Sequence, residues 1–257
     1  MKVVIIGSGN VATILGRRIL KAEHEIIQVI SRNELHAKPL AAELGCDYAT
    51  DLSKISLLAD LYIIAVSDNA IEDIAHSISL SNKIMVHTAG SVSKNILQRT
   101  SKNYGVLYPL QSLRKETNIN VKIPLLTDAN TEETLTFITD FAKTISAEVQ
   151  FADDYARLQL HIAAIIVNNF TNHLYTLTAD FCKQQNVDFG LLLPLIKETA
   201  DRLEHFRPAE MQTGPAIRRD ERTIQTHLEL LNGFHELKKI YQLFTESIQS
   251  QQSGKSI

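Results

Sequence analysis

The chain has 257 residues, a length that allows one large domain or two modest ones with a buried core. Hydrophobic residues make up 44% of it and charged residues 21%, as in ordinary globular proteins, and a net charge of -3 with scattered Lys and Arg gives no footprint for nucleic acid. The two cysteines, Cys46 and Cys182, and the nine histidines lack the spacing of a metal site, so we expect no metal and a reducing, cytoplasmic location.

The first 150 residues alternate β-rich runs with helical patterns. The strand-like runs are 2–6, 25–31, 60–66, 83–87, 103–108, 122–126 and 147–151. Helical periodicity is clearest at 10–22, 33–44, 70–78 and 131–144. This alternation predicts an α/β fold in which a mostly parallel, doubly wound sheet carries helices on both faces.

Beyond residue 152 the pattern is helical only. The helical stretches are 154–183, 188–205, 220–231 and 234–249, and the polar tail from Ser250 is expected to fray. We therefore predict an α/β domain over 1–152 and an all-α domain over 153–257. The longest apolar run of the helical part, 162–167, is far below the roughly 20 residues of a membrane span, so no membrane partner is expected.

A glycine-rich loop follows the first predicted strand and opens the first predicted helix. Its residues are Gly7, Ser8, Gly9, Asn10 and Val11, and Ala12 completes the G-x-G-x-x-A pattern. The glycines allow a tight turn and a close approach of the backbone to a pyrophosphate, which the helix N-terminus stabilises. This strand–loop–helix context predicts a Rossmann dinucleotide site; the alternative is a plain glycine turn before a helix.

The end of the second predicted strand indicates which dinucleotide binds. NAD-specific domains place an Asp or Glu there to hold the ribose 2′-hydroxyl. Here the strand ends in Ser31 and Arg32 with no carboxylate, and a guanidinium and a hydroxyl suit a 2′-phosphate. We therefore expect NADP as the cofactor of the 1–152 domain; alternatively, Arg32 is a solvated residue ahead of the next helix.

Loops at the carboxyl ends of the other strands should complete the ligand crevice. For the cofactor we select Val66, Ser67, Asp68, Thr88 and Ala89. For the reacting end we select His87, Ser91, Tyr108 and Gln111. Each also has a structural interpretation, since Ser67 and Asp68 can cap a helix and His87 can be a buried, hydrogen-bonded histidine.

A polar stripe runs along the mostly apolar stretch 154–183. On a regular helix Arg157, His161, Asn168 and Asn172 share one face. Buried polar groups need partners, so the stripe either bonds to neighbouring elements or lines a cleft against the α/β domain. His161 is the one member that exchanges a proton near neutral pH, and it is the expected proton donor, with Asn168, His87 and Ser91 beside it.

With these residues in view, the chain resembles the superfamily of pyrroline-5-carboxylate reductases, ketopantoate reductases, β-hydroxyacid dehydrogenases and deazaflavin-dependent NADP reductases. Its nearest likeness is a bacterial group of Rossmann-like NADP oxidoreductase-type proteins with a C-terminal domain of unknown function. The segments that carry the likeness are IIGSGNVAT (5–13), VHTAGSV (86–92), GVLYPLQSL (105–113), NNFTNHLY (168–175) and QTGPAIRRD (212–220). The resemblance implies a helical C-terminal domain that forms a homodimer and borders the substrate cleft.

One departure from the resembling dehydrogenases narrows the chemistry. They carry a Lys four residues before an Asn on the corresponding helix, whereas Ala164 precedes Asn168 here and no Lys occurs between Lys143 and Lys183. Imine reduction and hydride exchange with a deazaflavin do not need that lysine, and His161 could replace it in carbonyl reduction. Arg218 either holds an anionic substrate or is a solvated charge after the Gly214-Pro215 turn.

The sequence thus predicts an NADP(H)-dependent oxidoreductase that transfers hydride to a small metabolite with a C=N or C=O bond. Tyr108, Gln111, Asn172 and Arg218 are the candidate substrate residues. The alternative is an NADP-binding sensor without chemistry, because fold likeness alone does not separate the two.

Overall fold

A computed structural model of the chain describes residues 1–253 and divides into two compact units, Met1–Asn168 and Asn169–Ile257. The last strand ends at Phe151 and the next helix begins at Asp154, close to the boundary at 152 that the change of pattern suggested. That boundary stays a prediction, and each unit is described by itself.

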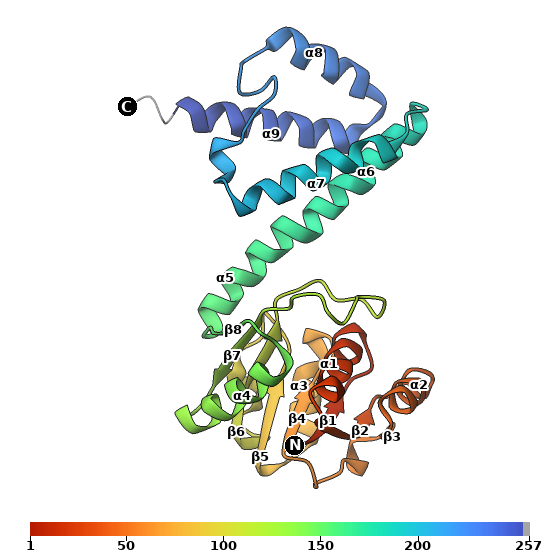
Figure 1. The fold of residues 1–257 in the computed structure, drawn as a ribbon, viewed down its shortest axis with the longest axis vertical. Coiled ribbons are helices and arrows are strands. Elements are labelled where there is room, and N and C mark those ends of the chain that lie inside the picture. Colours follow the sequence, from red (N-terminus) through yellow and green to blue (C-terminus); the bar gives the residue numbers. More distant parts are fainter. Residues whose placement is uncertain (254–257) are drawn as a thin grey trace. The chain divides into compact units, whose positions relative to one another are not determined.

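The first unit is built on one eight-stranded sheet (Figure 1). Its strands are β1 (Lys2–Ile6), β2 (Glu25–Ile30), β3 (Asp47–Ala49), β4 (Leu61–Ile64), β5 (Ser81–His87), β6 (Ser101–Pro109), β7 (Leu125–Ala129) and β8 (Val149–Phe151). Their order is β3-β2-β1-β4-β5-β6-β7-β8, and every neighbouring pair is parallel except β6 and β7. The predicted doubly wound, mostly parallel fold is confirmed; the three-residue strand β3 was not predicted, because it is too short to show a pattern.

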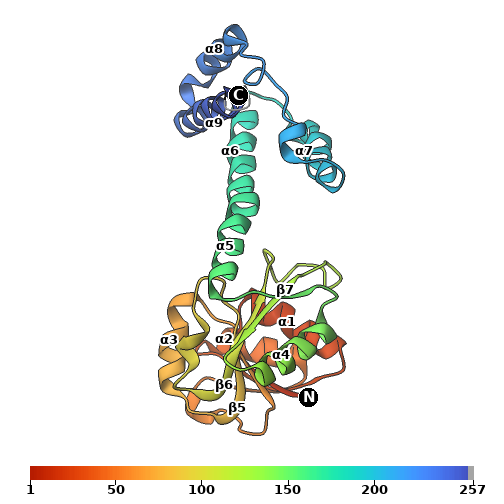
Figure 2. The same cartoon turned by 90° about the vertical axis from the view of Figure 1, so that its left-hand side faces the viewer.

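Helices cover both faces of this sheet (Figure 2). Helices α1 (Asn10–Lys21), α2 (Glu34–Leu44) and α4 (Glu132–Ile145) pack on one face, and α3 (Asp68–Ser77) packs on the other with two short 3-10 helices, Leu52–Lys54 and Lys94–Leu97. Successive side chains of the central strands enter opposite cores, as the alternation of a buried strand requires. This packing fixes the carboxyl ends of β1 to β6 at one edge of the sheet.

The long helical stretch predicted at 154–183 is interrupted. Helix α5 (Asp154–Ala164) begins at Asp153, whose carboxylate accepts the Ala156 backbone N–H at 2.8 Å, and it continues into a π-helical segment, Ile165–Phe170. A π-helix has wider turns than an α-helix. The 3.6-residue period that placed Asn168 on the face of Arg157 therefore does not hold within this segment.

The second unit is helical. It contains α6 (Thr171–Gln184), α7 (Leu193–Asp201), α8 (Glu221–Leu230) and α9 (His235–Ser253), with short 3-10 helices at Phe189–Leu192, Arg202–Glu204, Pro208–Glu210 and Leu231–Gly233. Helix α9 extends past Gln249, so the chain from Ser250 to Ser253 is helical, and the remainder of the tail expected to fray, 254–257, lies outside the described residues. None of the helices within 1–253 combines the length and apolar character needed to cross a membrane.

Candidate functional site

The turn after β1 requires glycine at its first position. Gly7 has a φ of +129°, and a Cβ added there would lie 2.0 Å from the carbonyl oxygen of Ala65. The backbone N–H of Gly7 donates to the Ile30 carbonyl at 2.7 Å, which ties the turn to β2. Any larger residue would push the turn away from β4, so the close approach of β1 and β4 depends on this glycine.

The N-terminus of α1 is open to an anion. Gly9 is the N-cap and no side chain caps the helix, so the first backbone N–H groups lack the usual side-chain acceptor. No acidic residue stands in the first turn. The free N–H groups and the helix dipole together favour a phosphate, which fits a dinucleotide at this loop.

A cavity of about 690 Å³ opens beside this loop, a size within the range of small-molecule sites. The predicted cofactor residues among its lining are Gly7, Ser8, Gly9, Asn10, Val11, Ser31, Arg32, Val66 and Ser67. The hydroxyl of Ser8 donates to that of Ser31 at 2.8 Å and so joins the phosphate loop to the end of β2. Arg32 is exposed at the end of β2. The next residue, Asn33, is the N-cap of α2, and its side-chain Oδ1 accepts a hydrogen bond from the Leu35 backbone N–H.

Three further residues predicted for the cofactor lie outside the described cavity lining. The Thr88 hydroxyl donates to the Ile64 carbonyl at 3.2 Å, and Ala89 is buried beside it. Asp68 is the first residue of α3, and its carboxylate accepts a hydrogen bond from the Ser91 hydroxyl. This last contact joins the loops that follow β4 and β5.

His87 ends β5 in the interior of the first unit. Its side chain is fully buried, and its Nδ1 accepts the Ala89 backbone N–H at 3.2 Å. Burial lowers the pKa of His87 to about 4, with the positive charge of Arg157 acting in the same direction. The imidazole is therefore neutral near pH 7 and is shielded from solvent, so a direct role in chemistry requires it to become accessible.

Tyr108, His161 and Gly90 meet at the carboxyl ends of β5 and β6. The Tyr108 hydroxyl and His161 Nδ1 are 2.9 Å apart and hydrogen-bonded, and the two rings meet edge to face. A Cβ added to Gly90 would lie 2.6 Å from His161 Nδ1 and 3.0 Å from Tyr108 Cζ. Burial raises the pKa of Tyr108, so its phenol keeps its proton at neutral pH. The structure thus brings a phenol and an imidazole into hydrogen-bond contact, with Gly90 packed against both rings.

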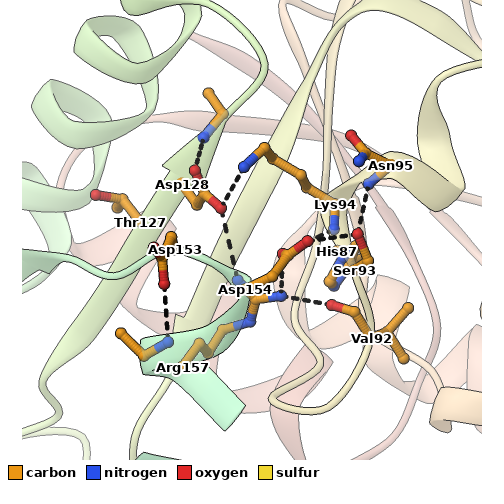
Figure 3. A network of polar contacts seen from close by, with 12 residues as sticks. His87, Val92, Ser93, Lys94, Asn95, Thr127, Asp128, Asp153, Asp154 and Arg157 are labelled. Atoms are coloured by element: carbon orange, nitrogen blue, oxygen red, sulfur yellow. Dashed lines mark hydrogen bonds and ion pairs between the residues drawn. The ribbon is translucent and has the colours of Figure 1, made fainter. Parts of the chain in front are cut away.

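A buried ion network lies one helical turn before His161 (Figure 3). Arg157 is 1% exposed and donates through Nη2 to Asp154 Oδ1 at 2.8 Å and to the Val92 carbonyl. Its Nη1 lies 3.8 Å from Asp128 Oδ2 on β7, and Lys94 Nζ donates to the same oxygen at 2.8 Å. The polar stripe had two interpretations, and Arg157 agrees with the first, because it bonds to neighbouring elements.

Four predicted site residues lie neither in the described cavity lining nor in contact with the Tyr108–His161 pair. Gln111 is exposed and donates through Nε2 to the Lys122 carbonyl at 3.3 Å, and Asn168 is exposed in the π-helical segment at the end of the first unit. Asn172 on α6 and Arg218 before α8 belong to the second unit, where both are exposed. Their part in a site remains a prediction.

Four residues of this region, Gly90, Lys94, Asp128 and Asp154, were not predicted from the sequence. Gly90 stood inside a selected loop but lacked a motif of its own. Asp128 lies in the observed strand Leu125–Ala129 but beyond the predicted run 122–126, so its burial, and with it the need for a polar or cationic partner, was not visible in the sequence. The identity of that partner depends on the tertiary fold.

Comparisons with known proteins identify the family. Residues 2–91 match the model described as NADP oxidoreductase coenzyme F420-dependent, and residues 123–248 match DUF2520, a domain of unknown function. A crystal structure from Bacteroides fragilis, provisionally named an NADP oxidoreductase, is 38% identical, with 97% of this chain and 98% of that chain covered and a TM-score of 0.90. The chain belongs to this NADP oxidoreductase family. The predicted resemblance is confirmed, and membership favours an oxidoreductase that uses NADP over a sensor.

More distant structures share the fold. An imine reductase from a Pseudomonas species is 18% identical, with coverage of 97% of this chain and 94% of that chain and a TM-score of 0.70. A 1-pyrroline-5-carboxylate reductase from Streptococcus pyogenes is 14% identical, with coverage of 97% and 98% and a TM-score of 0.63. No curated protein shows significant similarity to the chain.

Proposed function

We propose that this NADP oxidoreductase reduces a C=N or C=O bond of a small metabolite and that the Tyr108–His161 pair supplies the proton. The observation that carries the proposal is the 2.9 Å hydrogen bond between the Tyr108 hydroxyl and His161 Nδ1. His161 is partly exposed, so the pair can pass a proton between the interior and the solvent side.

The loop Gly7–Val11 would hold the pyrophosphate, and Arg32 with Ser31 would hold the 2′-phosphate. Both fit the observed geometry, since the open α1 N-terminus and the guanidinium border one cavity. When bound, NADPH supplies the hydride. The residues around it position the substrate and the proton.

The cavity and the proton-donating pair share the carboxyl edge of the sheet. Gly7 follows β1, Ser67 follows β4, Gly90 follows β5 and Tyr108 lies at the end of β6, and these four strands are adjacent and parallel. With about 4.8 Å between neighbouring strands, the turn after β1 and the end of β6 lie roughly 14 Å apart. Ligands of open α/β sheets bind across this edge, which supports a single site.

Among acceptors, the proposal favours an imine over a ketone. No lysine occurs between Lys143 and Lys183, and on α5 the partly exposed His161 is the acid–base group that contacts Tyr108. A protonated imine accepts hydride without a strong acid beside it, so a weak acid such as a histidine–tyrosine pair suffices. The imine reductase that shares this fold is consistent with that preference.

We propose that the remaining predicted residues contact the substrate around the Tyr108–His161 pair. Ser91 and Asn168 would contact the reacting group, and Gln111, Asn172 and Arg218 would contact more distant parts of the substrate. The Ser91 hydroxyl donates to the Asp68 carboxylate, and Ser91 directly follows Gly90 in the chain, which supports a role near the proton-donating pair. His87 is buried and neutral, so it would take part in the chemistry only after it becomes accessible.

A homodimer is part of the proposal. Within the described residues, the segment from α5 through the π-helical turn exposes large apolar side chains, among them Val167 at 71%, Phe170 at 59% and Ile166 at 52%. Contiguous apolar surface of this kind marks an interface. A second copy is the proposed occupant, because the same apolar segment on two identical chains is self-complementary in a symmetric dimer.

We also propose a cytoplasmic location. Cys46 and Cys182 are free thiols, and burial raises the pKa of Cys46 to about 11, which keeps it protonated and unreactive. Fractionation of cells that produce the protein tests this placement.

A substrate screen with site variants tests the function. The purified protein with NADPH is offered cyclic imines such as 1-pyrroline and 2-keto acids, and the loss of NADPH absorbance is followed. We expect turnover of imines, lowered about 10²- to 10⁴-fold in His161→Gln and Tyr108→Phe, with unchanged NADPH binding. Wild-type turnover in both variants, or no turnover of either class by the wild type, contradicts the proposal.

A further inference from the structure

Arg157 is the largest fully buried side chain among the described residues, and it contacts three different segments. Nη2 donates to the Val92 carbonyl, in the loop after β5, and to Asp154 Oδ1 in the first turn of its own helix. Nη1 lies 3.8 Å from Asp128 Oδ2 on β7. One guanidinium therefore ties α5 to a loop and to a strand (Figure 3).

The charges around Arg157 balance. Lys94 and Arg157 face Asp128 and Asp154, and the Asp154 carboxylate also accepts the Ser93 hydroxyl and the Lys94 backbone N–H at 3.1 Å. A buried ion pair contributes little net stability over apolar packing, because desolvation offsets its attraction. Its directional hydrogen bonds do fix the geometry of the segments that it joins.

Two of these segments lie against the proton-donating pair, since α5 carries His161 and the loop after β5 carries Gly90, while Tyr108 is on β6, between β5 and β7. His161 follows Arg157 by four residues on α5, about 6 Å along the helix axis. Gly90 precedes Val92 by two residues, and a Cβ on Gly90 would lie 2.6 Å from His161 Nδ1. Arg157 ties α5 to both neighbours of β6, so a shift of α5 against this part of the sheet alters the 2.9 Å contact between His161 and Tyr108.

We infer that Arg157 is a positioning residue for the reaction. It holds the first turn of α5 against Val92 and Asp128, and so sets the height and rotation at which His161 meets Tyr108. The effect on turnover rests on the proposed function of the pair, whereas the positioning of His161 does not.

The test compares two variants of the Arg157 network with a matched change at Arg18, a partly buried arginine. Arg157→Lys keeps the charge but cannot reach Val92, Asp154 and Asp128 together, and Asp128→Asn keeps the shape while it removes one charge. Arg18→Lys is the matched control, because Arg18 on α1 also binds backbone carbonyls, those of Ile145 at 3.0 Å and Ile119 at 2.9 Å. For each variant we would measure the thermal midpoint, NADPH affinity, kcat, KM and the side-chain ¹⁵N signals of His161, assigned with His161→Gln.

We expect Arg157→Lys and Asp128→Asn to shift the His161 signals and lower kcat by at least about tenfold, with unchanged NADPH affinity. Arg18→Lys should lower the thermal midpoint and leave the His161 signals and kcat as they are. Unchanged His161 signals in both network variants, or an equal shift in Arg18→Lys, would overturn the inference. If Arg157→Lys shifts the signals while His161→Gln retains wild-type turnover, the positioning stands and the proposed function fails.

Discussion

Gly90→Ala is the change that isolates the proton-donating pair. The added Cβ would lie 2.6 Å from His161 Nδ1, 2.7 Å from His161 Cγ and 3.0 Å from Tyr108 Cζ. Carbon contacts are ordinarily about 3.5 Å or longer, so the imidazole must retreat by about 1 Å. The φ of Gly90 lies outside the left-handed region, so the backbone accepts alanine and a movable side chain absorbs the clash.

The magnitude follows from the 2.9 Å separation of Tyr108 and His161. A retreat of about 1 Å takes the pair beyond the 2.5–3.2 Å range of hydrogen bonds, and misplacement of that size lowers a rate by about 10²-fold. Overpacking should cost about 1–3 kcal/mol of stability. We would measure imine-dependent NADPH oxidation, NADPH affinity and thermal unfolding, with Gly233→Ala as control because no heavy atom lies within 4 Å of its added Cβ. A rate within a few-fold of wild type in folded Gly90→Ala refutes the reasoning.

Three further changes test separate parts of the structure. Gly7→Ala should abolish NADPH binding in calorimetry, because its Cβ would meet the Ala65 carbonyl at 2.0 Å; binding at wild-type affinity would contradict the phosphate-loop assignment. Burial lowers the pKa of His87 to about 4 from 6.5, so the unfolded state binds a proton at His87 that the folded state does not, and the folded state loses stability as pH falls from 6.5 toward 4. The free energy of unfolding of the wild type, measured with denaturant, should fall by about 3 kcal/mol over that interval. If the free energy of His87→Gln falls with the same slope, His87 is not the cause. Val167→Glu should convert dimer to monomer in sedimentation velocity, since Val167 is 71% exposed in the single chain, whereas a monomeric wild type would remove the homodimer from the account.

Local patterns predicted the parts of the fold that local physics controls. The strand Lys2–Ile6 was predicted with its observed bounds, since a run of buried β-branched residues ending in glycine leaves few alternatives. The phosphate loop was predicted because its turn, its free helix N-terminus and its spacing are all encoded within a dozen residues. The π-helical segment Ile165–Phe170 was not, because no pattern in an apolar helix marks where the turn widens.

The proton-donating pair shows where sequence reasoning ends. Tyr108 and His161 were each predicted as site residues, but for different roles, and they stand 53 positions apart with no sign in the sequence that they share a hydrogen bond. The ion network could not be predicted from the sequence either. Its members Lys94, Asp128 and Arg157 come from three segments, and the order of β5, β6 and β7 in the sheet decides that they lie close together. Pairings of this kind are tertiary, and only the assembled sheet defines them.

The most direct test of the account is a calorimetric titration of the wild type and Arg32→Ala with NADPH and NADH. A guanidinium that pairs with the 2′-phosphate contributes about 1.5–3 kcal/mol, so wild type should bind NADPH at least about tenfold more tightly than NADH and Arg32→Ala should lose that preference. Equal affinity of the wild type for both cofactors, or a preference that survives in Arg32→Ala, would contradict the assignment of this cavity as an NADP site.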